Sequence, residues 1–327
     1  MNKKFFLSLL ISAIAIGALL YQFDINEFAK LRDKWNPYFL IPMVASNMFG
    51  IILFSLRWYF LLDRKISFFS SALIATIGLG GNMILPARGG DILRIYYTKK
   101  ASEIKYPTIL SQLFLEKVID LTIVLFIGAL SFMLLGLGNE NANPKAMMVS
   151  ALAVFGMILG LIMIRFANER IAKIGLFFFN LVQKPELFNE KIKPHLSELK
   201  DFLTWKKLTI PLLITVPTWI LAYAVTYCIQ SYLIGIPLSF TQSMFMVFCG
   251  AMGVAIPSAP SGLGVFHASI VSGFVLIGLG STDGFLYATA VHMLQFLVLS
   301  LFGLIAYIIW MNRKESILKD ELFDSLQ

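Results

Sequence analysis

The chain has 327 residues, of which 58% are hydrophobic and only 14% charged, and its formal net charge is +8. A soluble domain of this length could not bury so much apolar surface in one core, so the composition predicts a membrane protein. In a membrane protein an excess of Lys and Arg usually marks cytoplasmic loops. The positive charge therefore does not imply nucleic acid, and we expect no nucleic-acid partner.

Residue types that often carry chemistry are sparse. The two cysteines lie inside apolar stretches and the three histidines are scattered, so neither type predicts a disulfide framework or a metal site. The sequence contains no Walker loop, dinucleotide-binding fingerprint or serine-elbow motif. We expect no metal, no cofactor and no catalytic residue.

Apolar stretches long enough to cross about 30 Å of hydrocarbon recur along the chain. The first, residues 5–20, is interpreted as a span because no convincing signal-peptide cleavage site follows it. Residues 24–36 predict an interfacial amphipathic helix, and residues 167–206 an amphipathic cytoplasmic segment. Together with a short tail at 315–327, these features give one transmembrane domain over 1–314. The remaining apolar stretches are 38–62, 68–85, 107–135, 146–164, 208–228, 240–256, 262–279 and 285–310.

The stretch 68–85 ends at a break, because Pro86 and then Arg88, Gly89 and Gly90 follow it. If this stretch crossed the membrane completely, most of the basic residues would fall on the outer face, against the usual bias. A hairpin that turns at the break adds no crossing. Lys100, the long polar loop and the C-terminal tail then lie on the same side as the N-terminus. This arrangement predicts that both termini are cytoplasmic.

A second break follows the stretch 240–256, at Pro257, Pro260, Gly262 and Gly264. Paired breaks of this kind in the two halves of a chain indicate an inverted-repeat transporter with its site near the midplane. We therefore expect an all-α polytopic bundle with two re-entrant or discontinuous helix pairs. The sequence leaves open whether the second pair is a hairpin or two complete spans.

The charges at the first break have two interpretations. Asp91 and Arg94 are three residues apart, on one face of a helix that begins near Gly90. The free N–H groups at the start of such a helix, with Arg88 beside them, could bind a lipid phosphate. Alternatively, Asp91 could cap the helix itself and pair with Arg88 or Arg94, in which case these charges only hold the hairpin together.

A polar stripe follows on the stretch 107–135, where Gln112, Glu116 and Asp120 recur every four residues with Lys117 beside them. Glu116 lies close to mid-membrane, where an unpaired charge costs several kcal/mol. The stripe should therefore face the interior of the bundle. It could receive Arg88 or Arg94 in an ion pair, or it could carry a proton.

Three further residues are candidates on weaker grounds. Arg57 has Trp58 and Tyr59 next to it, which favours a side chain that extends to the interface, with a second phosphate contact as the alternative. Asn82 could line a lipid cavity or bridge two helices. His267 follows the second break and could titrate near neutral pH, although a lone histidine is more often a core residue.

Four short motifs, in this order, resemble the lysylphosphatidylglycerol synthase transmembrane-region family. The resemblance extends from the first span to Trp310, and this chain differs by having Lys117 and His267 where the family often has Arg and an acidic residue. The motifs are Arg57-Trp58 with Leu61-Leu62; Leu85-Pro86-x-Arg88-Gly89-Gly90-Asp91-x-x-Arg94; Glu116-Lys117-x-x-Asp120; and Pro257-Ser258-x-Pro260-Ser261-Gly262-Leu263-Gly264-Val265-Phe266.

The resemblance implies a flippase-like membrane domain of a bacterial cytoplasmic membrane, which moves a lipid between leaflets. No segment of the chain resembles the soluble aminoacyl-lipid synthase domain that follows this domain in fused members. The expected substrate is an anionic or phosphate-bearing lipid: a phospholipid, an aminoacyl-phospholipid, a glycolipid or a polyprenyl-phosphate carrier. The bilayer itself, cell-envelope biosynthesis enzymes and a second copy of the chain are the other partners considered. A membrane-embedded lipid-modifying enzyme and a non-transporting accessory subunit remain as alternatives.

Overall fold

The computed structural model describes residues 35–85, 88–137, 168–181, 185–193, 204–255 and 262–324. The expected span 5–20, nearly all of the expected interfacial helix, the expected span 146–164 and the three prolines of the two breaks lie outside these residues. Regular structure in the described part of the chain is helical throughout, and four of its helices are long and apolar enough to cross a membrane. The expected all-α membrane bundle is therefore confirmed.

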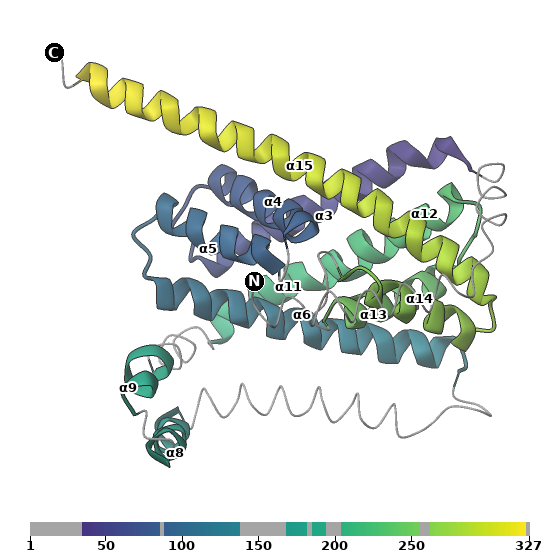
Figure 1. The fold of residues 1–327 in the computed structure, drawn as a ribbon, viewed down its shortest axis with the longest axis horizontal. Coiled ribbons are helices and arrows are strands. Elements are labelled where there is room, and N and C mark those ends of the chain that lie inside the picture. Colours follow the sequence, from purple (N-terminus) through teal and green to yellow (C-terminus); the bar gives the residue numbers. More distant parts are fainter. Residues whose placement is uncertain are drawn as a thin grey trace.

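The first half of the bundle contains two long helices with a shorter pair between them (Figure 1). Ser67 caps the start of the first helix of this pair, because its hydroxyl accepts a hydrogen bond of 3.1 Å from the N–H of Ser70. Pro107 lies at the start of the last helix, where its missing N–H costs no hydrogen bond. The elements are η1 (Pro37–Phe39), α3 (Leu40–Leu61), α4 (Phe68–Ile84), α5 (Gly89–Ala101) and α6 (Tyr106–Leu134).

The second half has the same order. Its first long helix contains a seven-residue π-helical segment that begins directly after Pro217. The helix then continues through α12 to Leu233, beyond the expected end near Cys228. The elements are α8 (Asn168–Leu181), α9 (Pro185–Leu187), η3 (Phe188–Ile192), α11 (Trp205–Pro217), η4 (Thr218–Ala224), α12 (Val225–Leu233), α13 (Phe240–Ala255), α14 (Val265–Leu276) and α15 (Ser281–Asp324).

The two halves correspond closely in spacing. Six residues separate α3 from α4, and six separate α12 from α13; four separate α5 from α6, and four separate α14 from α15. Gly78 and Gly81 are the eleventh and fourteenth residues of α4, and Gly250 and Gly253 hold the same places in α13. The described part of the chain thus contains an internal repeat of a long helix, a short helix pair and a long helix.

Each short pair packs through these glycines. A Cβ on Gly81 would lie 2.9 Å from the Cα of Gly90, and a Cβ on Gly253 would lie 2.9 Å from the carbonyl oxygen of Val265. The two helices of each pair therefore run side by side at a distance that only glycine permits. At about 1.5 Å per residue the 12 residues of α14 extend only about 18 Å, which is too short to cross the hydrocarbon alone.

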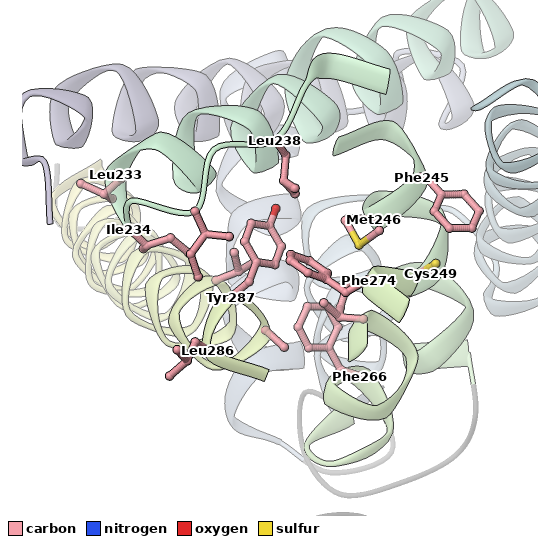
Figure 2. Packing of buried hydrophobic residues seen from close by; sticks show 14 of the residues in the cluster. Leu233, Ile234, Leu238, Phe245, Met246, Cys249, Phe266, Phe274, Leu286 and Tyr287 are labelled. Carbon is pink, nitrogen blue, oxygen red and sulfur yellow. The ribbon is translucent and has the colours of Figure 1, made fainter. Parts of the chain in front are cut away.

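The two halves also pack across each other. The long α15 lies along α4, where Gly80 and Gly303 meet so closely that a Cβ on either would lie 2.8 Å from the Cα of the other (Figure 1). In the same way α6 lies against α13. Each short pair therefore contacts the last helix of the other half. Figure 2 shows the apolar core of the second half, in which Phe274 packs against Tyr287 with ring centroids 5.2 Å apart and the rings tilted by 43°.

Candidate functional site

A fully buried ion pair joins the first short pair to α6. Arg94 on α5 donates two hydrogen bonds of 2.8 Å, one to each carboxylate oxygen of Glu116, and both side chains are 0% exposed. Its guanidinium also lies over two aromatic rings of α3, at 4.1 Å from the ring centroid of Trp58 and 4.6 Å from that of Phe54. This bidentate geometry is the strongest that arginine and a carboxylate can form.

A second ion pair lies one helical turn further along α6. Arg57 donates from both terminal nitrogens to Asp120, and the bond from Nη2 to Oδ2 measures 3.1 Å. Trp219, in the π-helical segment, donates a 2.8 Å hydrogen bond to the same carboxylate, and Thr215 accepts one of 3.2 Å from Arg57. Arg57 is 1% exposed, so it does not extend to the interface as the sequence favoured.

The two ion pairs form one network, because Nη2 of Arg57 also lies 3.6 Å from a carboxylate oxygen of Glu116. The structure thus pairs Glu116 with Arg94, one of the two partners that the sequence offered. Gln112 lies one turn before Glu116 and is also buried, so the four-residue repeat does face the interior. The side chains that complete the network come from α3, α5, α11 and η4, and they hold these helices against α6.

The tip of the first short pair carries a third cluster, which is centred on Asp91. Asn82 on α4 and Asp91 on α5 bond reciprocally: the Asp91 N–H donates to Asn82 over 3.2 Å, and the Asn82 amide donates back over 3.3 Å. Three cations surround the carboxylate of Asp91, at 3.3 Å for Lys117, 3.6 Å for Arg88 and 3.7 Å for Arg94. Asn82 therefore bridges two helices, one of its two expected roles.

The start of α5 differs in detail from the expected cap. Arg88 occupies the N-cap position with a left-handed backbone (φ 57°), and its side chain makes no capping hydrogen bond. Asp91 lies in the first turn instead, where a negative charge is favoured by the helix dipole. Gly89 and Gly90 form the first two residues of the helix, and Gly90 is buried against α4.

The network carries one more positive than negative charge. Among the described residues it holds the cations of Arg57, Arg88, Arg94 and Lys117 against the carboxylates of Asp91, Glu116 and Asp120. The buried arginines are each matched by their own carboxylate. The excess charge therefore falls on Arg88, which is 59% exposed, and Lys117, which is 30% exposed, and these two share Asp91.

The second half places a different pair in the corresponding position. His267, in the first turn of α14, lies against His292 of α15 with ring centroids 5.2 Å apart, and both are buried. Gly262 and Gly264 adopt positive φ values of 76° and 88° just before α14, so this turn uses backbone conformations that glycine provides. This pair thus contains neither an arginine nor a carboxylate, unlike the pair of Arg94 and Glu116.

Sequence reasoning missed several members of the site. Phe54, Thr215 and Trp219 are contacts of the buried charges, and His292 is the contact of His267. None of them belongs to a spaced motif. The sequence signal that could have found Trp219 is Pro217 two residues before it, since a proline within a span marks a local change of helical geometry.

The fold and the buried charges define a polytopic helical membrane protein whose ionisable residues gather inside the bundle. The chain belongs to the lysylphosphatidylglycerol synthase TM region family, whose model matches residues 5–303. It is similar to UPF0104 membrane protein MJ1078 of Methanocaldococcus jannaschii, with 28% identity over 70% of this chain and 93% of that protein. It is also similar to UPF0104 membrane protein MJ1595 of the same organism, with 29% identity over 36% of this chain and 37% of that protein. No solved structure matches the chain.

Proposed function

We propose that this chain moves an anionic or phosphate-bearing lipid between membrane leaflets and that the lipid head group binds at the tip of the first short pair. The membership in a family of membrane domains from lipid-handling proteins supports a lipid-related role. The observation that carries the proposal is the uncompensated positive charge of Arg88 and Lys117, which are the exposed cations of the network.

The head-group site that we propose uses only two of the four cations in the network, Arg88 and Lys117. Arg57 and Arg94 are each engaged by two oxygens of a carboxylate, so they offer little to a ligand. Arg88 is held by one contact of 3.6 Å to Asp91, and Lys117 by contacts of 3.3 Å to Asp91 and 3.4 Å to Glu116, all longer than the bonds of the buried arginines. A lipid phosphate can replace the carboxylate of Asp91 at both cations and form charge-assisted hydrogen bonds with them. In this arrangement Gly89, Gly90 and Asn82 shape the turn that presents the cations.

We further propose that both short pairs are re-entrant and that the two halves are inverted repeats. The lengths of α4, α5, α13 and α14 support this, because all four are shorter than the four long helices. Irregular backbone such as that at Arg88 and Gly264 is tolerated at membrane depth only where protein or a cavity surrounds it. A site near the midplane between such repeats can be reached from either leaflet in turn.

The proposed setting is the cytoplasmic membrane of a bacterium, with both termini in the cytoplasm. The chain would act there as a transporter and not as an enzyme, with the bilayer and its lipid substrate as partners. Cell-envelope biosynthesis enzymes would supply or consume the lipid, and a homo-oligomer is compatible with this role.

The experiment that tests the head-group site compares Arg88→Gln, Lys117→Gln and Lys65→Gln. The control Lys65 is an exposed lysine in the loop between α3 and α4, away from Asp91. Purified variants are titrated with phosphatidylglycerol in mild detergent while their melting temperature is recorded. Leaflet-specific assays in proteoliposomes then measure movement of a fluorescent phosphatidylglycerol.

We expect Arg88→Gln and Lys117→Gln each to weaken binding by about 1.5–3 kcal/mol, the usual contribution of a hydrogen bond to a charged group. Lys65→Gln should bind and move the lipid as the unmodified chain does. If all three variants behave alike, the hairpin tip is a structural turn and the head group does not bind there. Mass spectrometry of the lipid that co-purifies with the protein would identify the substrate class.

A further inference from the structure

The short helix pair and following span of each half enclose a titratable pair, and the two pairs differ in chemistry. In the first half the pair is Arg94 on α5 with Glu116 on α6. In the second half it is His267 on α14 with His292 on α15. Glu116 is the eleventh residue of α6 and His292 the twelfth of α15, so each lies about 15–17 Å along its helix. Glu116 and His292 therefore lie at similar distances along corresponding helices.

The histidine pair is enclosed by aromatic rings. Phe266 lies 5.2 Å from His292 and Phe285 lies 5.9 Å from His267, measured between ring centroids. The side chains of His267 and His292 are 7% and 9% exposed. Nδ1 of His267 has no hydrogen-bond partner among the described residues. The first turn of α14 contains no acidic residue, whereas the first turn of α5 contains Asp91.

Among the described residues, the other helices that pack most extensively against α14 and α15 carry no carboxylate. The sequences of α4, α12, α13 and α14 contain no Asp, Glu, Lys or Arg, and apart from His267 their titratable groups are thiols and phenols. Cys249 of α13 lies against Gly273, and Tyr287 of α15 donates its hydroxyl to the carbonyl of Tyr227. Asp283 is the nearest carboxylate on α15 and precedes His292 by nine residues, about 13 Å along the helix.

We propose that lipid movement by this chain is coupled to a proton and that His267 and His292 together bind that proton; this inference rests on the proposed function. A proton needs no cavity, so a closely packed aromatic site can accept it. Two imidazolium ions at this separation would repel, so the pair holds one proton at a time. An imidazolium in this buried, aromatic-lined place loses most of its hydration, so its charge disfavours the buried arrangement and favours one in which water reaches the pair.

The coupling follows from that difference in charge stability. A ligand shifts a conformational equilibrium when it binds one state better than the other. A proton that enters from the more acidic compartment favours the conformation that exposes the pair, and its release to the other compartment restores the buried one. The permanently charged Arg94–Glu116 pair cannot respond in this way near neutral pH, whereas histidine can. The first half thus provides the fixed charges and the second half the proton-dependent element.

The test uses proteoliposomes of phosphatidylcholine and phosphatidylglycerol that contain NBD-labelled phosphatidylglycerol as the probe. Its leaflet exchange is measured with no pH gradient and with gradients of either sign. We expect the rate of the unmodified chain to change by about fivefold or more between the two gradient signs, within the usual range of coupling between sites. In the double variant His267→Gln with His292→Gln that ratio should fall to one. His195→Gln, which removes the third histidine, should keep the ratio.

A second measurement needs no variant. Pyranine trapped in the vesicles records the pH inside while the probe crosses, and proton movement should accompany probe movement in the unmodified chain. If the probe moves without proton movement, or with equal rates in both gradients, or if the double variant keeps the ratio, the coupling proposal is wrong while the proposed function stands. If the unmodified chain moves no probe under any gradient, the proposed function itself fails, and the coupling fails with it.

Discussion

Arg94 and Glu116 meet through two hydrogen bonds of 2.8 Å at a place where neither side chain is exposed. Taking two charges out of water is expensive, and the cost is recovered only if the geometry is good and both partners remain. The bond pattern meets that requirement, because the guanidinium and the carboxylate face each other edge to edge. The pair should therefore be far more sensitive to loss of one partner than to loss of both.

The first prediction removes the partners separately and together. Glu116→Ala leaves Arg94 buried with only the 3.7 Å contact to Asp91 and should destabilise the protein by about 3–5 kcal/mol. Replacing both residues with leucine removes both desolvation costs, so the double variant should recover much of that loss. Melting temperatures in mild detergent provide the measurement.

The matched control for this comparison is Glu103→Ala. Glu103 is an exposed carboxylate in the loop between α5 and α6, so its loss should change stability by no more than about 0.5 kcal/mol. An unrecovered double variant would mean that Glu116 has a role that pairing does not explain, such as carrying a proton.

The second prediction concerns the close approach of α4 and α5. A Cβ on Gly90 would overlap the carbonyl oxygen of Gly78 and the backbone nitrogen of Asn82. Gly90→Ala should therefore separate the two helices and cost about 1–3 kcal/mol, as overpacking usually does. Gly280→Ala is the control, because a Cβ there would meet only an oxygen of Asp283 at 3.8 Å. Equal melting temperatures for the two variants would contradict the tight packing.

Much of this architecture could be predicted from the sequence, because helix capping and apolar length depend on residues that are close together in the chain. Ser67 caps a helix, Pro107 begins one, and apolar length separates spans from shorter helices, so most helix boundaries fall within a few residues of expectation. The four-residue spacing of Gln112, Glu116 and Asp120 likewise predicted that they share one face of α6. The interior position of that face followed from the cost of a charge in lipid.

The partners of the buried charges could not be predicted, because they depend on how helices distant in sequence pack. Arg57 has aromatic neighbours typical of an interfacial residue, yet Asp120 and Thr215 meet it only once α3, α6 and α11 are assembled. Trp219 reaches Asp120 from a π-helical segment, whose altered turn changes which side chains face α6. His267 and His292 likewise belong to no local pattern and meet only through the packing of α14 on α15.

The third prediction concerns topology. Lys100→Cys and Arg313→Cys, each in a background with Cys228→Ala and Cys249→Ala, should resist an impermeant thiol reagent in intact cells and react after permeabilisation. The reason is the clustering of basic residues on the cytoplasmic side if the first short pair is re-entrant. Asn141→Cys, in the polar segment 139–145 that we expect outside, serves as the accessible control. Labelling of Lys100→Cys in intact cells would show that α4 and α5 do not form a re-entrant hairpin.

The last prediction follows from the position of Asp91 among three cations. Its carboxylate occupies the place that we propose for a lipid phosphate, since it lies 3.3 Å from Lys117 and 3.6 Å from Arg88. Asp91→Asn removes this competing charge while its backbone N–H can still donate to Asn82. Arg94 remains held by Glu116 and Lys117 keeps its 3.4 Å contact to Glu116, so Arg88 loses its carboxylate partner and Lys117 loses one of its two. The variant should bind phosphatidylglycerol about tenfold more tightly, equivalent to about 1.4 kcal/mol, in a lipid-dependent thermal shift. Asp63→Asn makes the same charge change at a surface ion pair with Lys207 and should leave lipid binding unchanged. If Asp91→Asn binds the lipid no better than Asp63→Asn does, Asp91 does not occupy a head-group position, and its role is to hold α5 against α4 and α6.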